Sequence, residues 1–330
     1  MKIFELQEEK HERFLSYEDK VEKAKKTLKL AADMSRTYYK APLIISYSGG
    51  KDSDCLLHIA ESCLAPTEYE VFNSHTTLDP PEVVYHIKKQ FKRLSAGGGV
   101  KTTIKNLPTK EQTQITMWNL IVKHRTLPTR RVRFCCQELK ETGTPNRMVA
   151  LGVRASESAK RQGRDAFGIM GENIEKSNYY SLEHTEEVHR EAKDNDPVWD
   201  CTLIKAMRNR GNTLANPIYE FTDEELWRYI HENNVEVVSL YENGYKRVGC
   251  IGCPLATYQQ RMKEFSDYPK YKDAYMRAIE RMLEEKRKSG SKMPEGWTDA
   301  EAVFNWWMQK YERMPQGQLE FDFDGNIKEF

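Results

Sequence analysis

The sequence predicts an α/β fold in which a parallel sheet carries helices on both faces, with helical extensions at both ends. Two observations predict it. Short apolar runs bounded by glycine or proline alternate with amphipathic segments between residues 42 and 255, and charged segments with helical periodicity lie on either side of this region. Strands that alternate with helices form parallel sheets. Ligands bind such sheets at the carboxyl ends of the strands.

The chain divides into three predicted parts. Residues 1–41 are expected to be a helical segment, because Val21, Ala24, Leu28 and Ala31 recur at helical spacing. Residues 42–255 form the predicted nucleotide-binding domain, and residues 256–330 a helical extension. In the extension, the aromatic side chains of AVFNWWMQKY are expected to pack into a core.

Elements of the central part follow one another in a regular order. LIISYS, after Pro42, is typical of a buried strand, and SDCLLHIAESCL of the next helix. Strands are also expected at YEVFNSHT, VKTTIKNL and MVALGVRA, with a helix that begins with proline at PPEVVYHIKKQFKRL. Residues 172–212 have weak periodicity and dense charge, so we expect irregular structure there. Thr222 and Glu225 form a capping box that predicts the start of a further helix.

Composition excludes several classes of protein. The 51 basic and 50 acidic side chains give a formal charge of +1, so no global attraction to nucleic acid or to an anionic membrane is expected. No apolar run is long enough to span a bilayer, and the N-terminus is charged where a signal peptide is apolar, so we expect a cytoplasmic protein. The seven cysteines then indicate metal binding, redox chemistry or burial rather than a disulfide framework.

The stretch LIISYSGGKDSDCLLHIA, residues 43–60, predicts a phosphate site. A glycine-rich turn between a strand and a helix directs main-chain N–H groups and the positive end of the helix dipole at one point. Its spacing matches neither the loop of common nucleoside triphosphatases nor that of dinucleotide-binding folds. The alternative is a glycine turn with incidental hydroxyl groups. The predicted nucleotide-binding residues are Ser48, Gly49, Gly50, Lys51, Asp52 and Ser53, with Asp52 as the N-terminal acid of the helix or beside a magnesium ion. Lys51 and Asp52 are the predicted catalytic residues.

SGGKDS resembles the signature of the PP-loop ATP pyrophosphatases, which cleave ATP between its α and β phosphates. Five further segments resemble, in order, the phosphoadenylyl-sulfate (PAPS) and adenylyl-sulfate reductases and their sulfur-transfer, phosphorothioation-type relatives: FNSHTTLDPPEV, RFCCQELK, LGVRASESAKR, NPIYEFTDEELWRYI and LYENGYKRVGCIGCP. This resemblance implies an adenine nucleotide alpha-hydrolase-like fold. It also implies that Arg154 and Arg161 bind the anionic end of the nucleotide, where bidentate guanidinium groups are well suited. A surface ion pair is the alternative for each arginine.

Four cysteines predict a metal centre. Cys135 and Cys136 are adjacent, and Cys250 and Cys253 form CIGCP. Neighbouring cysteines would strain a single zinc ion but can both bind a wider [4Fe–4S] cluster, and the arrangement also resembles the cluster site of the adenylyl-sulfate reductases. Zinc, or buried or redox-paired thiols, are the alternatives. Of the remaining cysteines, Cys55 and Cys63 are expected to be buried, and Cys201 is unassigned.

Two groups of basic residues indicate a phosphate-rich partner. One lies in RTLPTRRVRF and the other in KAMRNRGN. The functional interpretation is contact with nucleic acid or with the nucleotide itself, and the alternative is a solvated face. The residues are Arg125, Arg130, Arg131 and Arg133 in the first group, and Lys205, Arg208 and Arg210 in the second.

Three functions follow from these observations. In the first, the loop binds ATP with Mg²⁺ and the enzyme adenylates a substrate, with release of pyrophosphate, in a sulfur-transfer reaction that uses a sulfur-donor protein. In the second, the protein reduces PAPS or adenylyl sulfate to sulfite with a thioredoxin-like reductant. In the third, it is a non-catalytic, nucleotide-binding regulatory module. The reductases resembled here use a cysteine in a C-terminal Glu-Cys-Gly motif, whereas this sequence has no cysteine after Cys253, which favours the first function.

Overall fold

The computed structural model describes residues 15–106, 114–141, 143–157, 161–169, 179–194, 202–209, 211–309, 320–321 and 327–328. The chain forms two compact units. The first consists of Met1–Ile115 and Cys135–Cys250, and the second of Thr116–Phe134 and Ile251–Phe330. The domain bounds predicted from the sequence, at residues 41 and 255, remain a prediction.

The centre of the first unit is a sheet whose strands run in the order β3-β2-β1-β4-β7-β5-β6. Neighbouring strands pair in parallel from β3 through β2, β1 and β4 to β7, whereas β5 pairs antiparallel with both β7 and β6. Burial on both faces explains the nearly continuous apolar sequence of the central strands. The strands are β1 (Leu43–Ser46), β2 (Tyr69–Ser74), β3 (Lys101–Lys105), β4 (Met148–Ala150), β5 (Phe167–Ile169), β6 (Tyr179–Tyr180) and β7 (Thr213–Ala215).

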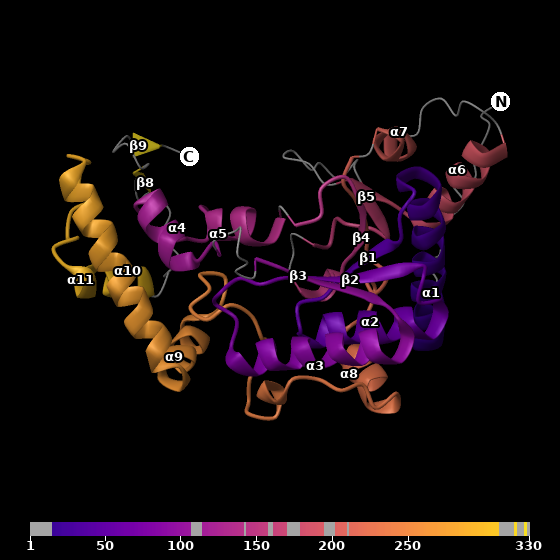
Figure 1. Ribbon diagram of the computed structural model, residues 1–330, viewed down its shortest axis with the longest axis horizontal. Coiled ribbons are helices and arrows are strands. Elements are labelled where there is room, and N and C mark those ends of the chain that lie inside the picture. The colour runs from indigo at the N-terminus through magenta and orange to yellow at the C-terminus, as the bar shows by residue number, and fades with distance from the viewer. Residues whose placement is uncertain are drawn as a thin grey trace, which may run out of the picture. The chain divides into compact units, whose positions relative to one another are not determined.

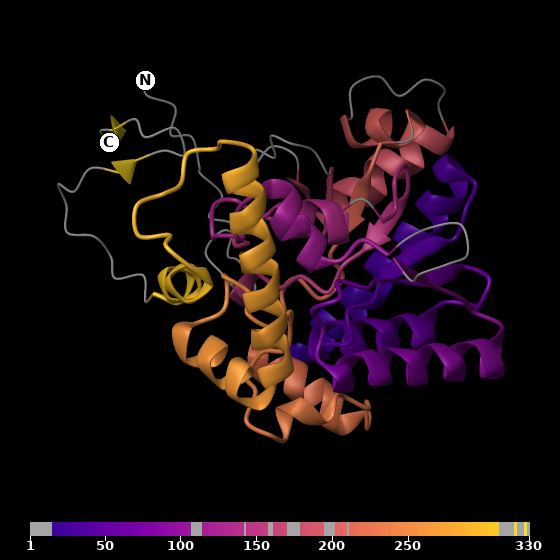
Figure 2. The same cartoon turned by 60° about the vertical axis from the view of Figure 1, so that its left-hand side comes forward.

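Helices lie on both sides of this sheet, as the sequence predicts. In Figure 1, α2 and α3 lie below the strands and α6 and α7 above them, and Figure 2 shows the same separation from another side. The helical elements of the first unit are α1 (Tyr17–Met34), the π-helix Ser35–Tyr39, α2 (Lys51–Cys63), α3 (Pro81–Gly98), the π-helix Gln137–Glu141, the 3₁₀ turn Ala155–Glu157, α6 (Leu182–Asp194), α7 (Thr202–Arg208), α8 (Asp223–Glu232) and the 3₁₀ turn Ser239–Tyr241. The short helix α5 (Phe134–Cys136) begins at the last residue of a second-unit segment and continues into the first unit.

Capping boxes open two helices of the first unit. A capping box of Ser16 and Asp19 opens α1, and the predicted box of Thr222 and Glu225 opens α8. Inside α1, the predicted apolar stripe is buried at Ala24, Leu28 and Ala31. No helix within the described ranges is long and apolar enough to cross a membrane.

One expectation about the fold is wrong. Residues 172–212 were expected to be irregular, but their described parts form β6, α6 and α7. The helix α6 is stabilised by contacts with α1 and its continuation: His189 makes hydrogen bonds of 3.0 Å with both Asp33 and Tyr38. Such contacts with a distant part of the chain leave little mark on the local hydrophobic pattern. Residues 170–178, 195–201 and 210 lie outside the described part of the chain.

Aromatic side chains build the core of the second unit. The ring of Tyr275 lies 5.1 Å from that of Trp118 and 4.9 Å from that of Trp307, and Trp307 Nε1 donates to the Pro128 carbonyl at 2.8 Å. The expectation that the aromatic side chains of AVFNWWMQKY pack into a core is confirmed for Phe304 and Trp307 but is wrong for Trp306, which is 37% exposed. Tyr311 lies outside the described residues. The elements are α4 (Met117–His124), α9 (Tyr258–Asp267), α10 (Pro269–Lys288), α11 (Ala300–Met308), β8 (Glu320–Phe321) and β9 (Ile327–Lys328).

The register of the sheet positions the candidate site. Ile45 of β1 pairs with Val71 of β2 on one side and Ala150 of β4 on the other. The parallel strands β1 and β4 therefore end side by side, and the connections that leave them start at the same edge of the sheet. The glycine loop follows β1 and the GVRAS segment follows β4.

Candidate functional site

A glycine turn joins the end of β1 to the start of α2. Gly50 is the N-cap of α2, and Gly49 has a φ angle of +73°, a conformation that favours glycine. A Cβ atom at Gly49 would lie 2.9 Å from Cγ1 of Ile87 on α3. The turn therefore requires glycine at this position, both for its backbone conformation and for its close packing against α3.

Hydroxyl groups fix the shape of this loop. Ser53 Oγ donates to the Gly50 carbonyl oxygen at 2.8 Å and accepts from the Ser48 main-chain N–H at 3.2 Å. The first main-chain N–H of α2, that of Lys51, donates to the hydroxyl oxygen of Tyr241 at 3.0 Å. The Tyr241 hydroxyl thus lies at the N-terminal end of the helix, where main-chain N–H groups attract anions.

Two cations and two carboxylates form an ionic network at the start of α2. Lys51 Nζ lies 2.9 Å from Asp223 Oδ1 and 3.6 Å from Asp52 Oδ2. Arg154 Nε lies 2.5 Å from Asp52 Oδ1, and Arg154 Nη2 lies 2.7 Å from Asp223 Oδ1. Three segments therefore meet here: the first turn of α2, the connection after β4 and the first turn of α8.

The cations of this network are buried, whereas one of the carboxylates is largely exposed. The exposed fraction is 8% for the Lys51 side chain and 2% for Arg154, but 65% for Asp223. A hydrogen bond from Lys51 lowers the pKa of Asp223, so this carboxylate is ionised at neutral pH. Burial lowers the pKa of Arg154, but the charge and hydrogen bond of Asp52, together with Asp223, outweigh burial and raise it. The buried charges of Lys51 and Arg154 are thus both paired with the solvent-exposed carboxylate of Asp223.

A second glycine lets the connection after β4 approach the loop. A Cβ atom at Gly152 would lie 2.9 Å from the carbonyl oxygen of Asp52. Because glycine stands there, the main chain passes close to the first turn of α2, and Arg154 follows two residues later. The structure therefore brings the predicted arginine of GVRASESAKR directly to the predicted loop.

Arg161, the other predicted arginine, has a carboxylate partner close to it in sequence. Its Nη1 forms an ion pair with Glu157. Burial and the positive charges of Arg164 and Arg247 lower the pKa of Arg161, so three guanidinium groups influence one another in this part of the first unit. The role of Arg161 in anion binding stays a prediction.

Three residues near the loop had no role in the sequence-based prediction: Asp223, Tyr241 and Arg247. They lie in NPIYEFTDEELWRYI and LYENGYKRVGCIGCP, two of the segments that carry the family resemblance. The family resemblance of these segments was the feature of the sequence that could have indicated a role for the three residues. Their residue types are common on protein surfaces, so composition did not distinguish them.

Below the loop, a buried carboxylate connects it to α3. Asp54 Oδ1 accepts a hydrogen bond from the Tyr47 hydroxyl and lies 2.9 Å from His86 Nε2. Burial raises the pKa of Asp54. Its Oδ2 has no hydrogen-bond partner within the described part of the chain. This cluster anchors Tyr47, the first residue of the loop, from beneath.

The four cysteines predicted to bind a metal are divided between the units. Cys135, Cys136 and Cys250 belong to the first unit and Cys253 to the second. Cys250 Sγ donates to Thr76 Oγ1 at 3.4 Å. Across the described ranges, no group of three or more His, Cys, Asp or Glu side chains is arranged to hold a metal ion. The metal centre on these four cysteines therefore stays a prediction.

Two of the other cysteines, Cys55 and Cys63, lie on α2. Cys55 is fully buried, as predicted, and burial raises its pKa. Cys63 is half-buried, whereas the sequence predicted a buried side chain, and partial burial raises its pKa to about 11. Cys201 lies outside the described residues. Cys55 and Cys63 are therefore weakly acidic thiols and lack the low pKa of a reactive cysteine.

Arg125, Arg130, Arg131 and Arg133 are all exposed and belong to the second unit. Arg125 Nη1 donates to Ser291 Oγ at 2.9 Å, and Arg130 Nε donates to the Pro254 carbonyl at 3.1 Å. These arginines are therefore a feature of the second unit. In the other basic group, Lys205 and Arg208 lie on α7 of the first unit, and Arg210 lies outside the described residues.

Sequence comparison finds short matches to adenosine 5′-phosphosulfate reductases. Identity is 39% over 44 residues with the protein of Neisseria meningitidis, 31% over 49 residues with that of Anoxybacillus flavithermus and 40% over 37 residues with that of Oceanobacillus iheyensis. These matches cover 13%, 15% and 11% of this chain. They span only 18%, 21% and 15% of the lengths of the relatives.

Solved structures with similar folds include three kinds of protein. PAPS reductase from Candida auris, in a phosphate complex, has 16% identity and a TM-score of 0.35 over 72% of this chain and 96% of its own. FMN adenylyltransferase from Candida glabrata, with FMN and an ATP analogue, has 13% identity and a TM-score of 0.41 over 71% and 64%. A U34-tRNA thiolase from Methanococcus maripaludis, with its [4Fe-4S] cluster, has 11% identity and a TM-score of 0.36 over 82% of each chain.

Because these TM-scores are low, the family assignment rests on a longer match in sequence. Residues 42–256 match the family described as phosphoadenosine phosphosulfate reductase domain. This range is more than half of the chain, and it contains the glycine loop, the ionic network and all four paired cysteines. The chain therefore belongs to the phosphoadenosine phosphosulfate reductase domain family.

Proposed function

We propose that this protein binds an adenine nucleotide at the glycine loop and, with ATP, adenylates a substrate and releases pyrophosphate in a sulfur-transfer reaction. The supporting observation is the ionic network at the start of α2. Lys51 and Arg154 place two buried positive charges beside the N-terminal end of a helix, an arrangement that favours a phosphate group. The family match supports the nucleotide as the source of that phosphate.

The carboxylates of the network favour ATP over a sulfonucleotide. Asp52 and Asp223 cancel the charges of Lys51 and Arg154, so an anion that enters alone is repelled by two carboxylates. A polyphosphate that enters with Mg²⁺ brings positive charge with it, and Asp52 and Asp223 carry the oxygen ligands that Mg²⁺ prefers. When bound, the metal ion would neutralise charge on the phosphates.

In the proposed reaction, an oxygen of the acceptor attacks the α phosphorus of ATP and forms a new P–O bond. The bond from the α phosphorus to the oxygen that bridges it to the β phosphorus breaks, and pyrophosphate leaves with that electron pair. Lys51 and Arg154 would stabilise the negative charge that grows on the leaving group. The glycine loop would hold the phosphates in line for the attack.

A sulfonucleotide reductase is the second candidate. It is favoured by the short matches to adenosine 5′-phosphosulfate reductases, although these cover 18% or less of the Neisseria and Oceanobacillus relatives. In this function, the loop holds the sulfate end of the nucleotide, and no metal ion is needed beside the two cations.

Calorimetric titration with ATP and with PAPS, each with and without Mg²⁺, distinguishes the two candidates. The adenylating function predicts that binding of ATP requires Mg²⁺ and that PAPS binds more weakly. Assays for pyrophosphate with ATP, and for sulfite with PAPS and reduced thioredoxin, then identify the reaction. Tight, metal-independent binding of PAPS without binding of ATP would contradict our proposal.

The sequence also predicts a [4Fe–4S] cluster on Cys135, Cys136, Cys250 and Cys253, with a sulfur-donor protein or a thioredoxin-like reductant as partner. The support for the cluster is the pattern of these cysteines in the sequence. Its presence is a separate question from nucleotide binding, and iron analysis answers it.

A further inference from the structure

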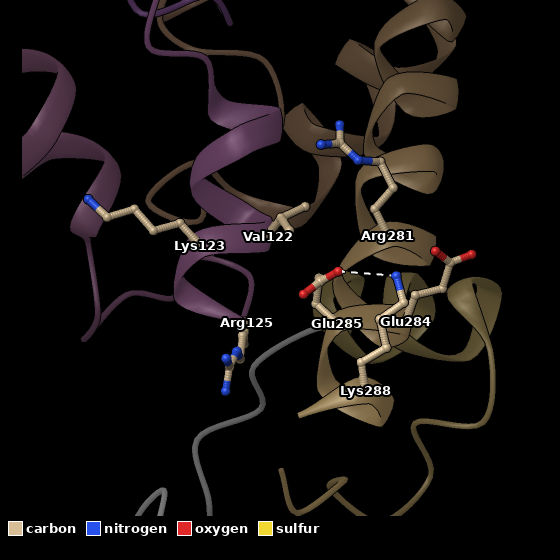
Figure 3. Close-up of a pocket in the computed structure, with 7 residues that line it drawn as sticks. All are labelled: Val122, Lys123, Arg125, Arg281, Glu284, Glu285 and Lys288. Carbon is tan, nitrogen blue, oxygen red and sulfur yellow. Dashed lines mark hydrogen bonds and ion pairs between the residues drawn. The ribbon is translucent and has the colours of Figure 1, made fainter. Parts of the chain in front are cut away.

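A cavity in the second unit has a strongly cationic lining. It has a volume of about 430 Å³ and lies between α4 and α10. Figure 3 shows the lining residues on the two helices, with the Lys123 side chain extending away from α10 and Lys288 beside Glu285. Its lining consists of Val122, Lys123, Arg125, Arg281, Glu284, Glu285 and Lys288. We call the four basic residues among these the α4–α10 basic surface.

Helix dipoles account for part of this positive charge. Trp118, near the start of α4, contacts Tyr275 near the start of α10, while the last turns of both helices line the cavity. The two helices therefore run in the same direction and end together. Each C-terminal end carries about half a negative charge, so about one positive charge would compensate both.

The positive charge of the α4–α10 basic surface is larger than the charge that would compensate the two helix ends. The lining has four basic and two acidic side chains, and the last turn of α10 adds Lys286 and Arg287. Glu285 is paired with Lys288 at 3.4 Å. Arg281 has no ion-pair partner among the residues that the structure describes. Residues 116–134, which include α4, carry five basic and no acidic side chains. A surplus of positive charge therefore remains at this end of the helices.

Arg125 is held at the edge of the cavity in an unfavourable backbone conformation. It is the C-cap of α4 and has a φ angle of +54°, in the left-handed region where glycine or asparagine is usual. Strained residues of this kind are concentrated at functional sites. The burial of Lys286 and the charge of Arg125 lower the pKa of Lys286, which agrees with excess positive charge in this region.

An exposed aromatic side chain is connected to the last turn of α10 through Trp297. Trp306 of α11 is 37% exposed, and its ring lies 5.1 Å from that of Trp297. Lys286 Nζ lies 5.8 Å from the centroid of the Trp297 ring. The buried Trp297 therefore links the last turn of α10 to an indole that remains accessible to solvent.

We propose that the α4–α10 basic surface, together with Trp306, binds single-stranded nucleic acid. Proteins that bind single strands combine basic side chains that contact the phosphates with aromatic side chains on which bases stack. The basic residues supply the first feature on two helices, and Trp306 supplies the second. A duplex keeps its bases stacked on one another and leaves none for Trp306, so the single strand is the form that fits.

This inference goes beyond the proposed function, because it concerns the second unit and uses no residue of the glycine loop. It assigns a partner to Arg125, one of the arginines of the basic segment RTLPTRRVRF. DNA and RNA share the required chemistry, and the experiment compares them directly.

Fluorescence anisotropy with labelled 20-nucleotide probes tests the proposal on the full-length protein. The probes are single-stranded DNA, single-stranded RNA and duplex DNA, each measured between 50 and 200 mM salt. We expect Arg281→Glu to weaken single-strand binding about tenfold and to make its salt dependence less steep, because a phosphate contact is lost. Trp306→Ala is expected to weaken it about fivefold or more through loss of stacking.

Lys270→Glu is the matched control, because Lys270 is an exposed lysine at the opposite end of α10. Lys270→Glu changes the charge by the same amount as Arg281→Glu and should leave single-strand binding nearly unaltered. Lys51→Ala separates this site from the glycine loop and should also leave single-strand binding unchanged. Circular dichroism and thermal melting confirm that each variant is folded.

Three results would overturn the proposal. The first is equal binding by Arg281→Glu and Lys270→Glu. The second is tighter binding of duplex than of single strands, with no effect of Trp306→Ala. The third is binding to vesicles that contain phosphatidylserine without binding to any oligonucleotide. A preference for the RNA probe over the DNA probe would support contacts with the 2′-hydroxyl group.

Discussion

Arg154 Nε lies 2.5 Å from Asp52 Oδ1, although 102 residues separate the two in the chain. The same guanidinium group donates from Nη2 to Asp223 Oδ1 at 2.7 Å. One planar side chain thus bridges two carboxylates from two different helices. This bridge joins the glycine loop to the start of α8.

The first prediction concerns this bridge. Lysine keeps the charge but cannot reach two carboxylates with a planar fork. Arg154→Lys is therefore expected to lower the free energy of unfolding by about 1–3 kcal/mol, because the partly buried carboxylate of Asp52 loses a charged hydrogen bond. Urea denaturation measures this change. Arg161→Lys is the control, because Arg161 has its ion pair with one carboxylate, Glu157, and should lose less stability. Equal losses would contradict the bridging role.

The second prediction concerns the exposed carboxylate over the two cations. Asp223→Asn removes a negative charge that competes with a bound anion at Lys51 and Arg154. We expect the variant to bind pyrophosphate about threefold to tenfold more tightly without Mg²⁺, and to gain less from Mg²⁺ than the wild type. Calorimetry measures both effects, and Glu224→Gln, which alters the neighbouring exposed acid, is the control.

The pH dependence of this effect follows from the pKa of Asp223, which a hydrogen bond from Lys51 lowers. The carboxylate is ionised above its folded pKa, so the variant and the wild type should differ by the same factor between pH 5 and 8. They should converge only in more acidic solution, where Asp223 takes up a proton. Convergence near neutral pH would show that another group controls binding.

The third prediction concerns the catalytic role of the loop. Lys51→Ala and Asp52→Asn are each expected to abolish turnover but to leave the melting temperature nearly unchanged. In both variants the Arg154 guanidinium keeps Asp223 as its partner, so its buried charge is not left unpaired. Steady-state kinetics and thermal melting measure the two effects. Lys92→Ala, an exposed lysine on α3, is the control. A large loss of stability in both loop variants would indicate a structural turn instead.

The fourth prediction concerns the backbone of the loop. Gly49→Ala introduces a Cβ atom at a φ angle of +73° and 2.9 Å from Ile87 Cγ1. It should lower the free energy of unfolding by about 1–3 kcal/mol. Gly97→Ala, in the open last turn of α3, should instead raise it by up to about 1 kcal/mol, because alanine favours the helix. Opposite signs in urea denaturation support the required glycine, whereas equal signs contradict it.

The fifth prediction concerns the metal. Protein purified without oxygen is expected to be brown and to contain iron and sulfide. A serine at any of Cys135, Cys136, Cys250 or Cys253 should lower the iron content and bleach the colour. Cys63→Ser is the control, since Cys63 belongs to neither cysteine pair. Stoichiometric zinc without iron, in protein from iron-replete cells, would contradict the cluster.

Much of the site could be predicted from sequence because its parts are local. A short apolar run, two glycines and a helical pattern already specify a strand, a turn and a helix, and each depends on neighbours within a few residues. The prediction of the strand before the loop and the helix after it is confirmed at Leu43–Ser46 and Lys51–Cys63. The capping box at Thr222 was equally local, and it is present.

The sequence by itself determined the α/β fold, the position of the glycine loop and the presence of buried apolar strands, since these follow from local periodicity and backbone preference. Only the tertiary structure decided that Asp223 pairs with Lys51 and Arg154, that Tyr241 accepts the first N–H of α2, and that residues 116–134 join the C-terminal helices. The physical reason is that ion pairs and packing depend on distances between segments. Those distances are set by the order of strands in the sheet and by the docking of helices, which no local pattern records.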